Sequence, residues 1–519
     1  MRIAVLAALM AGVAAGGAGV AAQQRRPRTP AFAIEEATIE SVHAAFKRGT
    51  LTCRGLVDAY LRRIELHDKQ GAALNAIVQI NPNATAEADA LDRRFRREGL
   101  TGPLHCVPAI VKDNFETIGL QSAAGSLAFK GFVSPKDAFQ VRRIKEAGAI
   151  VIAKSNMAEF AFTPYETVSS ILPGYTRNPY ALNRVTAGSS GGTAAAIAAN
   201  FGLIGLGSDT GNSIRGPASH QALAGIRSTM GLTSRAGVVP LSLLADVAGP
   251  MTRTLADGVA VLQVIAGYDS DDPATEAARG REIPNYAASL VKGGLKGARI
   301  GVLRQAYERD TTDPEIVKVF EAALADMRRA GAIIVDPIRV DLSGVRRAQG
   351  AGACGGFKYD INRYLAGLGA AAPQKNLEAI VRSRQFHPTV QRRLETAQEG
   401  AENGPDTPAC KAEQDYRVAF RAAVDAAMQK EQLDAFVYPT WSNPPRLIGD
   451  LNTPHGDNSQ VFAPTSGYPA INVPMGYTRG NTLPAGITFF GRGWDESTLI
   501  RVAYSYEQLT KHRRKPDLH

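Results

Sequence analysis

Three segments in the first half of the chain combine residue types that can carry covalent catalysis. An apolar run, residues 107–111, ends in Lys112. Residues 187–192 read Ala-Gly-Ser-Ser-Gly-Gly, and residues 207–217 read Gly-Ser-Asp-Thr-Gly-Asn-Ser-Ile-Arg-Gly-Pro. Together they offer serine hydroxyls, an amine in apolar surroundings and a glycine-rich loop with free backbone N–H groups. This set is sufficient to cleave an amide bond by nucleophilic catalysis with no histidine, metal or cofactor.

Lys112 is the most informative of these residues because the five residues before it are all apolar. A free lysine titrates near ~10.4, and burial lowers that pKa because it disfavours the charged form. A neutral lysine amine can act as a general base. The alternative is a structural lysine that pairs with Asp113 or another carboxylate.

The third segment predicts an oxyanion hole made of consecutive backbone N–H groups, those of Thr210, Gly211, Asn212 and Ser213. These residues follow a predicted strand at residues 203–207, so their N–H groups can converge on one point. Donors of this kind stabilise the oxyanion of an acyl-transfer intermediate by ~3 kcal/mol each.

Two other motifs fit parts of the same region less well. Residues 188–192 satisfy G-x-S-x-G, which would make Ser190 the nucleophile of an α/β-hydrolase. That motif needs a strand directly before it, whereas residues 177–183 are typical of a loop. Residues 205–211 resemble a dinucleotide-binding fingerprint, but the glycine spacing differs by one residue and the next helix begins too late. Neither alternative is favoured.

The surrounding sequence predicts strands that alternate with helices. Strands are expected at residues 74–80, 109–111, 149–153, 203–207, 299–303, 332–335, 435–438, 470–473 and 485–490. Helical periodicity follows Thr38 and Thr52 and recurs at residues 85–97, 137–147, 193–199, 217–224, 313–329 and 496–509. This alternation predicts an α/β fold built on a layered sheet. Residues 342–432 predict a variable helical insertion over one face.

Composition and charge are those of a globular protein, with 45% hydrophobic and 21% charged residues. The net charge of +10 lies partly in basic clusters at residues 25–28 and 511–515, which we interpret as solvated tails. No nucleic-acid-binding motif accompanies the charge, so we expect no nucleic-acid partner.

The N-terminus predicts an export signal. Met1-Arg2 gives a positive start, residues 3–20 are apolar, and the small residues up to Ala22 predict cleavage there. A retained membrane anchor is the alternative. Residues 23–33 predict a disordered leader, and residues 34–519 a single domain. No later segment reaches ~18 uninterrupted apolar residues, so no stable membrane insertion is expected after cleavage. We expect an exported protein, periplasmic or secreted.

The four cysteines fit an oxidising compartment without requiring disulfides. None has C-x-x-C spacing, so a zinc site is not expected. Cys53 lies on an apolar helical pattern and is interpreted as a core thiol. Cys354 and Cys410 lie in the less regular later region, where a disulfide between them is one option.

The sequence resembles the amidase signature enzymes from about Thr38 to Gln508. The resemblance is densest at residues 188–252 and extends to residues 467–474, Gly-Tyr-Pro-Ala-Ile-Asn-Val-Pro. It implies a large mixed, mostly parallel sheet covered by helices on both faces. It also implies a Ser–Ser–Lys triad of Lys112 as the base, Ser189 as a bridging serine after a cis peptide bond, and Ser213 as the nucleophile.

Three positions depart from the family pattern, which favours glycine where Cys106, Ala187 and Asn212 stand. Asparagine tolerates a left-handed backbone better than most residues, so we expect the oxyanion loop to keep its shape. Asp209 and Arg215 bracket this loop and are expected to form a structural ion pair. Ser190 is expected to hydrogen-bond to the loop and not to react.

Substrate specificity in this family resides in variable segments, here residues 155–180 and 342–465. Phe160, Ala161 and Tyr165 are the candidate pocket residues. The resemblance implies hydrolysis of a small-molecule carboxylic acid amide to acid and amine or ammonia through an acyl-enzyme on Ser213. The alternatives are a carbamate or ester hydrolase on the same triad, the glutamine-amidohydrolase subunit of a tRNA amidotransferase, and a non-catalytic binding protein. No metal or cofactor is expected, and the protein is expected to be a monomer or homodimer.

Overall fold

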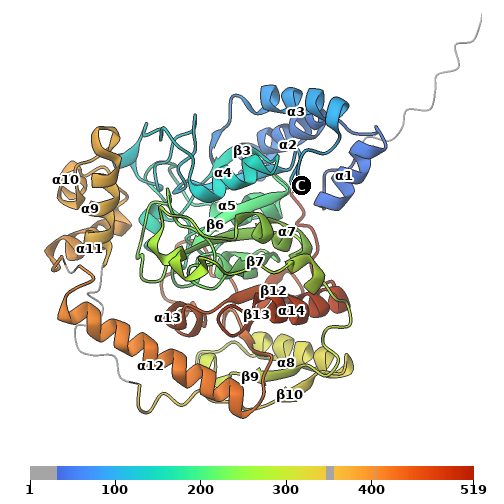
Figure 1. Ribbon diagram of the computed structural model, residues 1–519, viewed down its shortest axis with the longest axis vertical. Helices are drawn as coiled ribbons and strands as arrows, with labels where there is room; N and C mark the ends of the chain where they lie inside the picture. Colours follow the sequence, from blue (N-terminus) through green and yellow to red (C-terminus); the bar gives the residue numbers. More distant parts are fainter. Residues whose placement is uncertain (1–31, 346–355, 403, 519) are drawn as a thin grey trace, which may run out of the picture.

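An eleven-stranded sheet runs through the part of the chain that the computed structural model describes, residues 32–345, 356–402 and 404–518 (Figure 1). Its strands are β1 (Ile77–Ile80), β2 (Pro108–Lys112), β3 (Ile150–Ser155), β6 (Ile204–Asp209), β7 (Ala224–Arg227), β8 (Val247–Thr252), β9 (Arg299–Val302), β10 (Ile333–Val335), β11 (Ala435–Pro439), β12 (Ala470–Thr478) and β13 (Leu483–Phe490). Across the sheet they lie in the order β1-β3-β2-β6-β8-β7-β12-β13-β11-β9-β10.

Parallel pairing is confined to the two wings of this mixed sheet. β2 pairs in parallel with β3 and β6, and β9 pairs in parallel with β10 and β11. The other six neighbouring pairs of the described sheet are antiparallel. The expected mixed sheet is therefore confirmed, whereas its mostly parallel order holds in the wings and not in the centre. β12 and β13 illustrate the reason, since the short turn between them requires antiparallel pairing.

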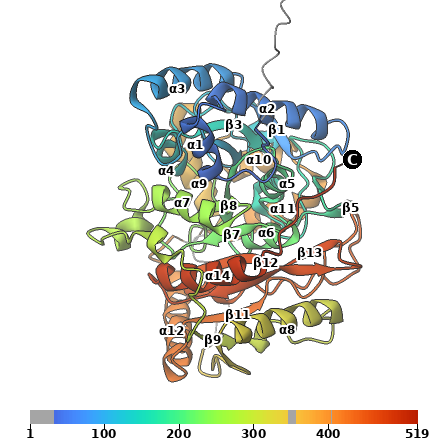
Figure 2. The same cartoon turned by 90° about the vertical axis from the view of Figure 1, so that its right-hand side faces the viewer.

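Helices cover both faces of the sheet, as expected (Figures 1 and 2). One layer consists of helices that contact one another in the order α4 (Phe139–Glu146), α7 (Leu255–Ile265), α14 (Glu496–Thr510) and α8 (Pro314–Arg329). The opposite layer contains α5 (Gly191–Ala198) and α6 (Arg215–His220). At β7, Gly225 approaches Ala218 of α6 and the next residue, Ile226, approaches Gly258 of α7. Successive strand residues point to opposite faces, so α6 and α7 lie on opposite sides.

The N-terminal helices begin where the sequence predicts. Thr38 caps α1 (Ile39–Lys47) by accepting the backbone N–H of Ser41, and Thr52 caps α2 (Cys53–His67) by accepting that of Gly55. Such caps stabilise a helix by ~1 kcal/mol because they satisfy N–H groups that have no partner inside the helix. The next helix, α3 (Ala84–Glu98), packs against α2 and closes this end of the sheet.

The expected insertion is helical where it is described. It contains α9 (Gly356–Leu368), α10 (Leu377–Ser383), α11 (Pro388–Glu399) and α12 (Pro408–Lys430), which stand at the left of Figure 1. Apolar residues of α9 to α11 form a hydrophobic cluster with residues of the segment 123–162, separate from the two larger clusters that line the sheet. Helices α9 to α11 therefore pack onto one flank of the sheet domain through a small core, whereas α12 contributes Phe420 and Val424 to one of the two larger clusters.

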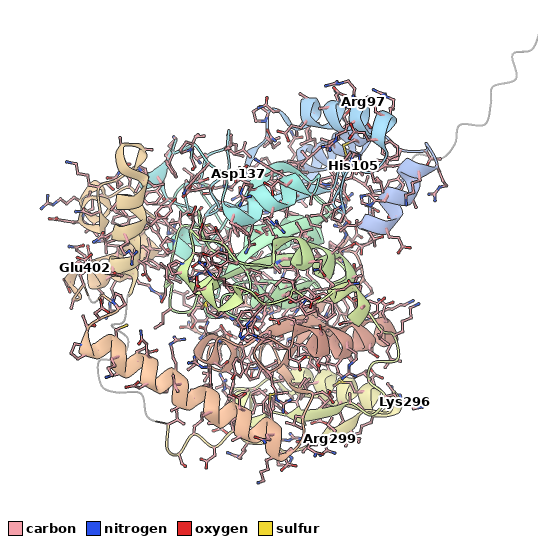
Figure 3. The ribbon with its side chains drawn as sticks, viewed as in Figure 1. Arg97, His105, Asp137, Lys296, Arg299 and Glu402 are labelled. Carbon is pink, nitrogen blue, oxygen red and sulfur yellow. A yellow bond between two sulfur atoms is a disulfide. The ribbon has the colours of Figure 1, made fainter. Side chains whose placement is uncertain are left out.

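A disulfide joins Cys53, on the first turn of α2, to Cys106, two residues before β2. Figure 3 marks its place by His105, the residue before Cys106. The interpretation of Cys53 as a core thiol is therefore wrong. The sequence separation of 53 between the two cysteines leaves no short-range pattern, which is why the sequence did not predict the pairing. The other pairing considered, Cys354 with Cys410, involves Cys354, which lies outside the described residues.

The basic C-terminal segment is docked on the protein and is not a solvated tail, contrary to expectation. Arg513 is partly buried at the base of the segment, where it forms an ion pair with Glu36 and donates to the carbonyl of Ala222. Lys515 pairs with Glu35, and Arg514 lies over the ring of Tyr477. These acidic and aromatic partners come from distant parts of the chain, so local sequence could not predict them.

The predicted signal peptide, residues 1–22, and most of the predicted leader lie outside the described residues. Phe32, within the leader as predicted, packs against the hydrophobic core and thus belongs to the folded body. Among the described helices, none is long and apolar enough to cross a membrane.

Residues 177–185, expected as a loop over 177–183, form a small two-stranded ribbon of β4 (Arg177–Asn178) and β5 (Ala181–Val185). This ribbon is separate from the large sheet. The strand before Gly188 is therefore not a sheet strand that could support an α/β-hydrolase nucleophile, so the structure does not place Ser190 on such a turn.

Candidate active site

Two neighbouring parallel strands bring the candidate residues together. Lys112 ends β2, and the loop at residues 210–214 follows β6, which pairs directly with β2. Ser189 lies just before α5, whose N-terminus packs beneath the same strand ends. Because parallel strands end at the same edge of a sheet, the lysine and the loop meet there. The three residues of the predicted triad thus converge at one place.

Lys112 is completely buried and contacts hydroxyls instead of a carboxylate. Its Nζ lies 2.7 Å from Ser189 Oγ and 2.8 Å from Ser208 Oγ. Burial lowers the pKa of Lys112 to about 7, although the charges of Asp246 and Asp209 act in the opposite direction. Asp113, the partner considered for a structural lysine, instead accepts the N–H of Gly125 at 2.9 Å. The amine is therefore placed and tuned to exchange a proton near neutral pH.

Ser208 is a contact that the sequence analysis missed. Its hydroxyl accepts hydrogen bonds from Lys112 and, at 3.1 Å, from the side-chain amide of Asn114. It lies in β6, one strand away from Lys112, and nothing in its local sequence distinguishes it from a structural serine. Ser208 therefore holds Nζ through a second hydroxyl besides that of Ser189.

Ser189 follows a cis peptide bond to Gly188, as the resemblance implied. A Cβ at residue 188 would lie 2.5 Å from the carbonyl oxygen of Glu166, so only glycine fits there. Ser190 donates from Oγ to the carbonyl of Ser208 at 3.2 Å, and its N–H donates to the carbonyl of Ser213 at 3.3 Å. Ser190 therefore binds the loop, as expected, and ties the backbone beside Ser189 to that of Ser213.

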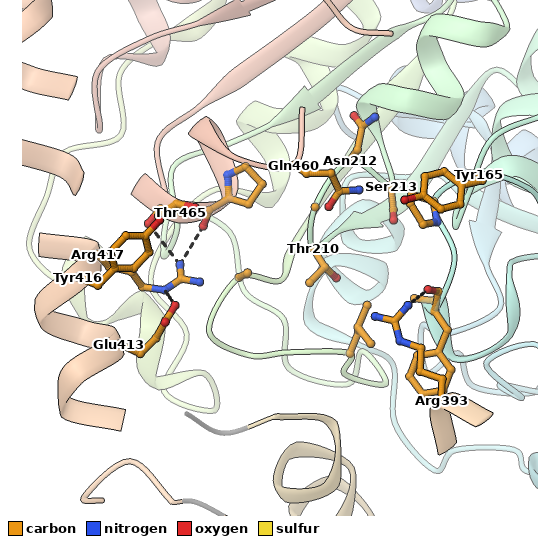
Figure 4. Close-up of a pocket in the computed structure, with 17 residues that line it drawn as sticks. Tyr165, Thr210, Asn212, Ser213, Arg393, Glu413, Tyr416, Arg417, Gln460 and Thr465 are labelled. Carbon is orange, nitrogen blue, oxygen red and sulfur yellow. Dashed lines mark hydrogen bonds and ion pairs between the residues drawn. The ribbon is translucent and has the colours of Figure 1, made fainter. Parts of the chain in front are cut away.

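Ser213 lies between β6 and α6, and its side chain reaches the wall of a cleft (Figure 4). Among the described residues, no hydrogen bond involves its hydroxyl, so Oγ is free to turn toward Ser189 or toward a substrate. The N–H groups of residues 210–213 likewise have no acceptor within the described chain, whereas those of Ile214 and Arg215 donate to Asp209. Four consecutive donors thus remain available beside the hydroxyl.

Asn212 behaves differently from the expectation. Its backbone is not in the left-handed region, so tolerance of that conformation is not what permits asparagine here. Its side chain turns away from the cleft and donates to Asp457 Oδ1 at 2.8 Å (Figure 4). Asp457 also accepts the side-chain amide of Gln460, which packs against Gly211. Asn212 therefore anchors the loop to residues 457–460.

Asp209 and Arg215 form the expected ion pair, and a third residue completes it. Asp209 contacts Arg215 at 3.1 Å and Arg227 at 3.0 Å, and all three side chains are fully buried. Burial opposes the ionisation of Asp209, but the two guanidinium groups outweigh it and lower its pKa to about 2. Arg227, at the end of β7, had no signal in the sequence. The ion pairs of Asp209 with Arg215 and Arg227 hold the base of the loop that carries Ser213.

The cleft beside Ser213 has a volume of about 360 Å³. Ala161 and Tyr165 line it, as predicted, together with Phe162. Phe160 does not: it is 2% exposed and its ring packs against Phe129 and Phe357 in the core of the insertion. Its backbone is left-handed, with φ of 49°, which turns the side chain inward and presents the next residues to the cleft.

Charged residues of the insertion complete the cleft, and sequence reasoning located their segment but not the residues. Arg393 of α11 donates to the carbonyl of Phe162 and stacks over its ring. Arg417 of α12 pairs with Glu413 at 3.0 Å at the far end (Figure 4). Ser213 and Tyr165 thus lie at one end of an elongated polar cleft, and Arg417 lies at the other.

Comparisons with known proteins extend over the whole of this site. A family model described as Amidase matches residues 55–500. A probable amidase of Arabidopsis thaliana is 34% identical, over 96% of this chain and 94% of its own. A glutamyl-tRNA(Gln) amidotransferase subunit of Moorella thermoacetica is also 34% identical, over 89% of this chain and 94% of its own. The structure of native peptide amidase from Stenotrophomonas maltophilia gives a TM-score of 0.85 at 37% identity, covering 93% of this chain and 99% of that one.

Proposed function

The chain belongs to the amidase family and hydrolyses C–N amide bonds, and we propose that it does so through an acyl-enzyme on Ser213 with Lys112 as the base. One observation carries the proposal. A fully buried lysine donates to Ser189 at 2.7 Å, and within the described residues no carboxylate lies at ion-pair distance from it. A lysine in this environment can be neutral and accept a proton at physiological pH.

The proposed reaction begins with two coupled proton transfers. Neutral Lys112 takes the hydroxyl proton of Ser189, which takes that of Ser213, and Ser213 Oγ forms a bond to the amide carbonyl carbon. The carbonyl oxygen becomes an oxyanion that accepts hydrogen bonds from the N–H groups of residues 210–213. As the C–N bond breaks, the proton passes back through Ser189 to the leaving nitrogen. Water then repeats the sequence on the ester and releases the acid and free Ser213.

The rate of hydrolysis is expected to depend on pH through Lys112. Its pKa of about 7 means that the amine is neutral above this value and charged below it. We expect kcat/KM to fall about tenfold for each pH unit below about 7 and to reach a plateau above it, because only the neutral amine accepts a proton. Initial rates between pH 5 and 9, with stability checked at each pH, test this. A profile that stays flat down to pH 5 would contradict a lysine base.

The shape of the cleft supports a polar amide as the substrate. It is elongated, and the guanidinium of Arg393 borders it within reach of a substrate bound at Ser213. Such a site favours a peptide-like or amino-acid amide over a long unbranched fatty amide, because a polar substrate can replace the hydrogen bonds that the cleft makes with water and a fatty chain cannot. Peptide amidase, one of the similar solved structures, is named for substrates of this kind.

A substrate panel tests the proposal against its alternatives. We expect a peptide-like C-terminal amide to exceed a long-chain fatty amide by at least about tenfold in kcat/KM, since a fatty chain displaces water from the polar lining of the cleft without replacing its hydrogen bonds. An anilide, a carbamate and an ester of matched acyl group separate the alternative bond types. Free glutamine tests the role in a tRNA amidotransferase that the Moorella thermoacetica relative favours. Turnover of glutamine and of no other amide, and only with partner chains present, would replace the proposed function with that one.

We also propose that the protein is exported. The signal-like sequence at residues 1–22 and the disulfide between Cys53 and Cys106 both support an oxidising compartment. Mass spectrometry of the native protein is expected to find a mature N-terminus at Gln23. A cytosolic protein that retains Met1 would contradict export without affecting the proposed chemistry.

A further inference from the structure

Asp246 is a buried carboxylate beside the active site that the proposed mechanism does not use. It is 7% exposed and lies just before β8. Since Asp209 pairs with Val247 in the sheet, the residue before β8 lies opposite Thr210, where β6 ends and the oxyanion loop begins. The topology thus places this carboxylate at the start of the loop that carries Ser213.

Among the described residues, the hydrogen bonds of this carboxylate come from the oxyanion loop and from the segment at residues 241–242. Oδ1 accepts the hydroxyl of Thr210 at 2.5 Å, and Oδ2 accepts the N–H groups of Leu241 and Ser242 at 2.9 and 3.0 Å. Burial raises the pKa of Asp246, and the hydrogen bonds from Thr210, Leu241 and Ser242 oppose this effect. Three donors and no bonded acceptor suit the ionised carboxylate. Leu241 also lines the cleft. One side chain therefore holds both the first residue of the loop and a second segment of the cleft wall.

Asp246 also contributes charge near the base. The charged groups that face it are Lys112 from β2, Arg227 from β7, Arg235 from the loop after β7, and Asp360 from α9. Within the described residues, none of these cations lies at ion-pair distance from Asp246. The negative charge of Asp246 is therefore not neutralised by a direct ion pair. Of the carboxylates that act on Lys112, Asp246 has the largest effect. A negative charge in dry surroundings favours the charged amine and opposes the effect of burial.

We propose that Asp246 is a positioning residue for amide hydrolysis, which holds Thr210 in the oxyanion loop through its hydroxyl and keeps Lys112 basic through its charge. The inference rests on the proposed function. The two effects act on different steps. Loss of the hydrogen bond loosens the oxyanion donors and lowers kcat, whereas loss of the charge makes Lys112 a weaker base and moves the acid limb of the pH profile.

Two substitutions separate these effects. Thr210→Val removes the hydroxyl and keeps the charge; we expect kcat to fall about tenfold with KM and the acid limb unchanged, because a donor of the oxyanion hole is loosened. Asp246→Asn removes the charge; we expect a similar fall in kcat together with an acid limb about one pH unit lower. Thr210→Ser restores the hydroxyl and is expected to restore kcat. In the double variant the losses in kcat should be less than multiplicative, since both changes break one hydrogen bond.

Asp360→Asn is the matched control. Asp360 is also buried, accepts the N–H of Leu243 at 2.9 Å, and does not act on Lys112. It should leave both kcat and the acid limb unchanged. The proposal is overturned if Asp246→Asn keeps the wild-type acid limb, or if Thr210→Val keeps wild-type kcat, which decides the matter even if Asp246→Asn does not fold. If one of these two results is found and Ser213→Ala is inactive, the role of Asp246 is refuted but the proposed function is not.

Discussion

Replacement of Ser213 by alanine abolishes amide hydrolysis, with an expected loss in kcat of at least about 10⁴-fold. The hydroxyl is the group that forms the covalent bond, and the other hydroxyl of the loop, that of Thr210, is already bound to Asp246. Residual turnover would come only from water held by the oxyanion loop. The measurement is kcat on a peptide-like amide, with the mass of the protein during turnover showing an acyl adduct in the wild type and none in the variant.

Lys112→Met should reduce kcat as severely, because it removes the base while it keeps most of the buried volume. Met fills the apolar channel of the lysine stem but leaves the hydroxyls of Ser189 and Ser208 without the amine that joins them. The control is Ser190→Ala. The hydroxyl of Ser190 donates to the carbonyl of Ser208, so its loss costs one hydrogen bond and should leave most of the activity. An active Ser213→Ala protein would end the acyl-enzyme proposal, and an inactive Ser190→Ala protein with normal Ser213 reactivity would revise the relay.

The residues that could be predicted are those whose chemistry is unusual for their local sequence. A lysine after five apolar residues, and serines between glycines, are costly unless they serve a purpose, so Lys112, Ser189 and the segment around Ser213 stood out. Ser208 and Asp246 escaped notice because a serine or aspartate near a strand end is ordinary in sequence. Their significance comes from the pairing of β6 with β2 and β8, which joins residues far apart in the chain.

Sequence patterns failed to predict two features, the direction of the Phe160 side chain and the directions of the central strands, because both depend on three-dimensional contacts. The sequence located the two segments that line the cleft, but the left-handed backbone at Phe160 decides that this ring enters the core and that its neighbours face the cleft. Nine of the eleven strands of the described sheet were predicted near their observed positions, because burial gives each of them a continuous apolar run. Strand β7 was missed because residues 217–224 were expected to be helical, and β8, which contains a glycine and a proline, was not expected. The strand directions in the centre of the sheet were not predicted, since strand order depends on contacts that no local pattern records.

Removal of the Cys53–Cys106 disulfide should lower the free energy of unfolding by about 4 kcal/mol, because the bond closes a long loop and thereby reduces the entropy of the unfolded chain. The loop is set by the 53-residue separation of the two cysteines. This loop contains α2, β1 and α3. The disulfide therefore joins the start of α2 to the segment that leads into β2, the strand that carries Lys112. We expect Cys53→Ala/Cys106→Ala to unfold at a lower denaturant concentration while the folded enzyme retains most of its kcat, since neither cysteine is among the described residues that line the cleft.

The backbone at Cys106 allows this effect to be separated from a second one. Its φ is 55°, in the left-handed region that glycine adopts without cost and alanine does not. Cys53→Ala/Cys106→Gly should therefore be more stable than the double alanine variant by about 1 kcal/mol, although both lack the bond. The difference between wild type and the glycine variant then measures the cross-link with less contribution from backbone conformation. A loss below about 1 kcal/mol in that comparison would show that the bond does not restrain the unfolded chain, and would remove the structural support for an oxidising compartment.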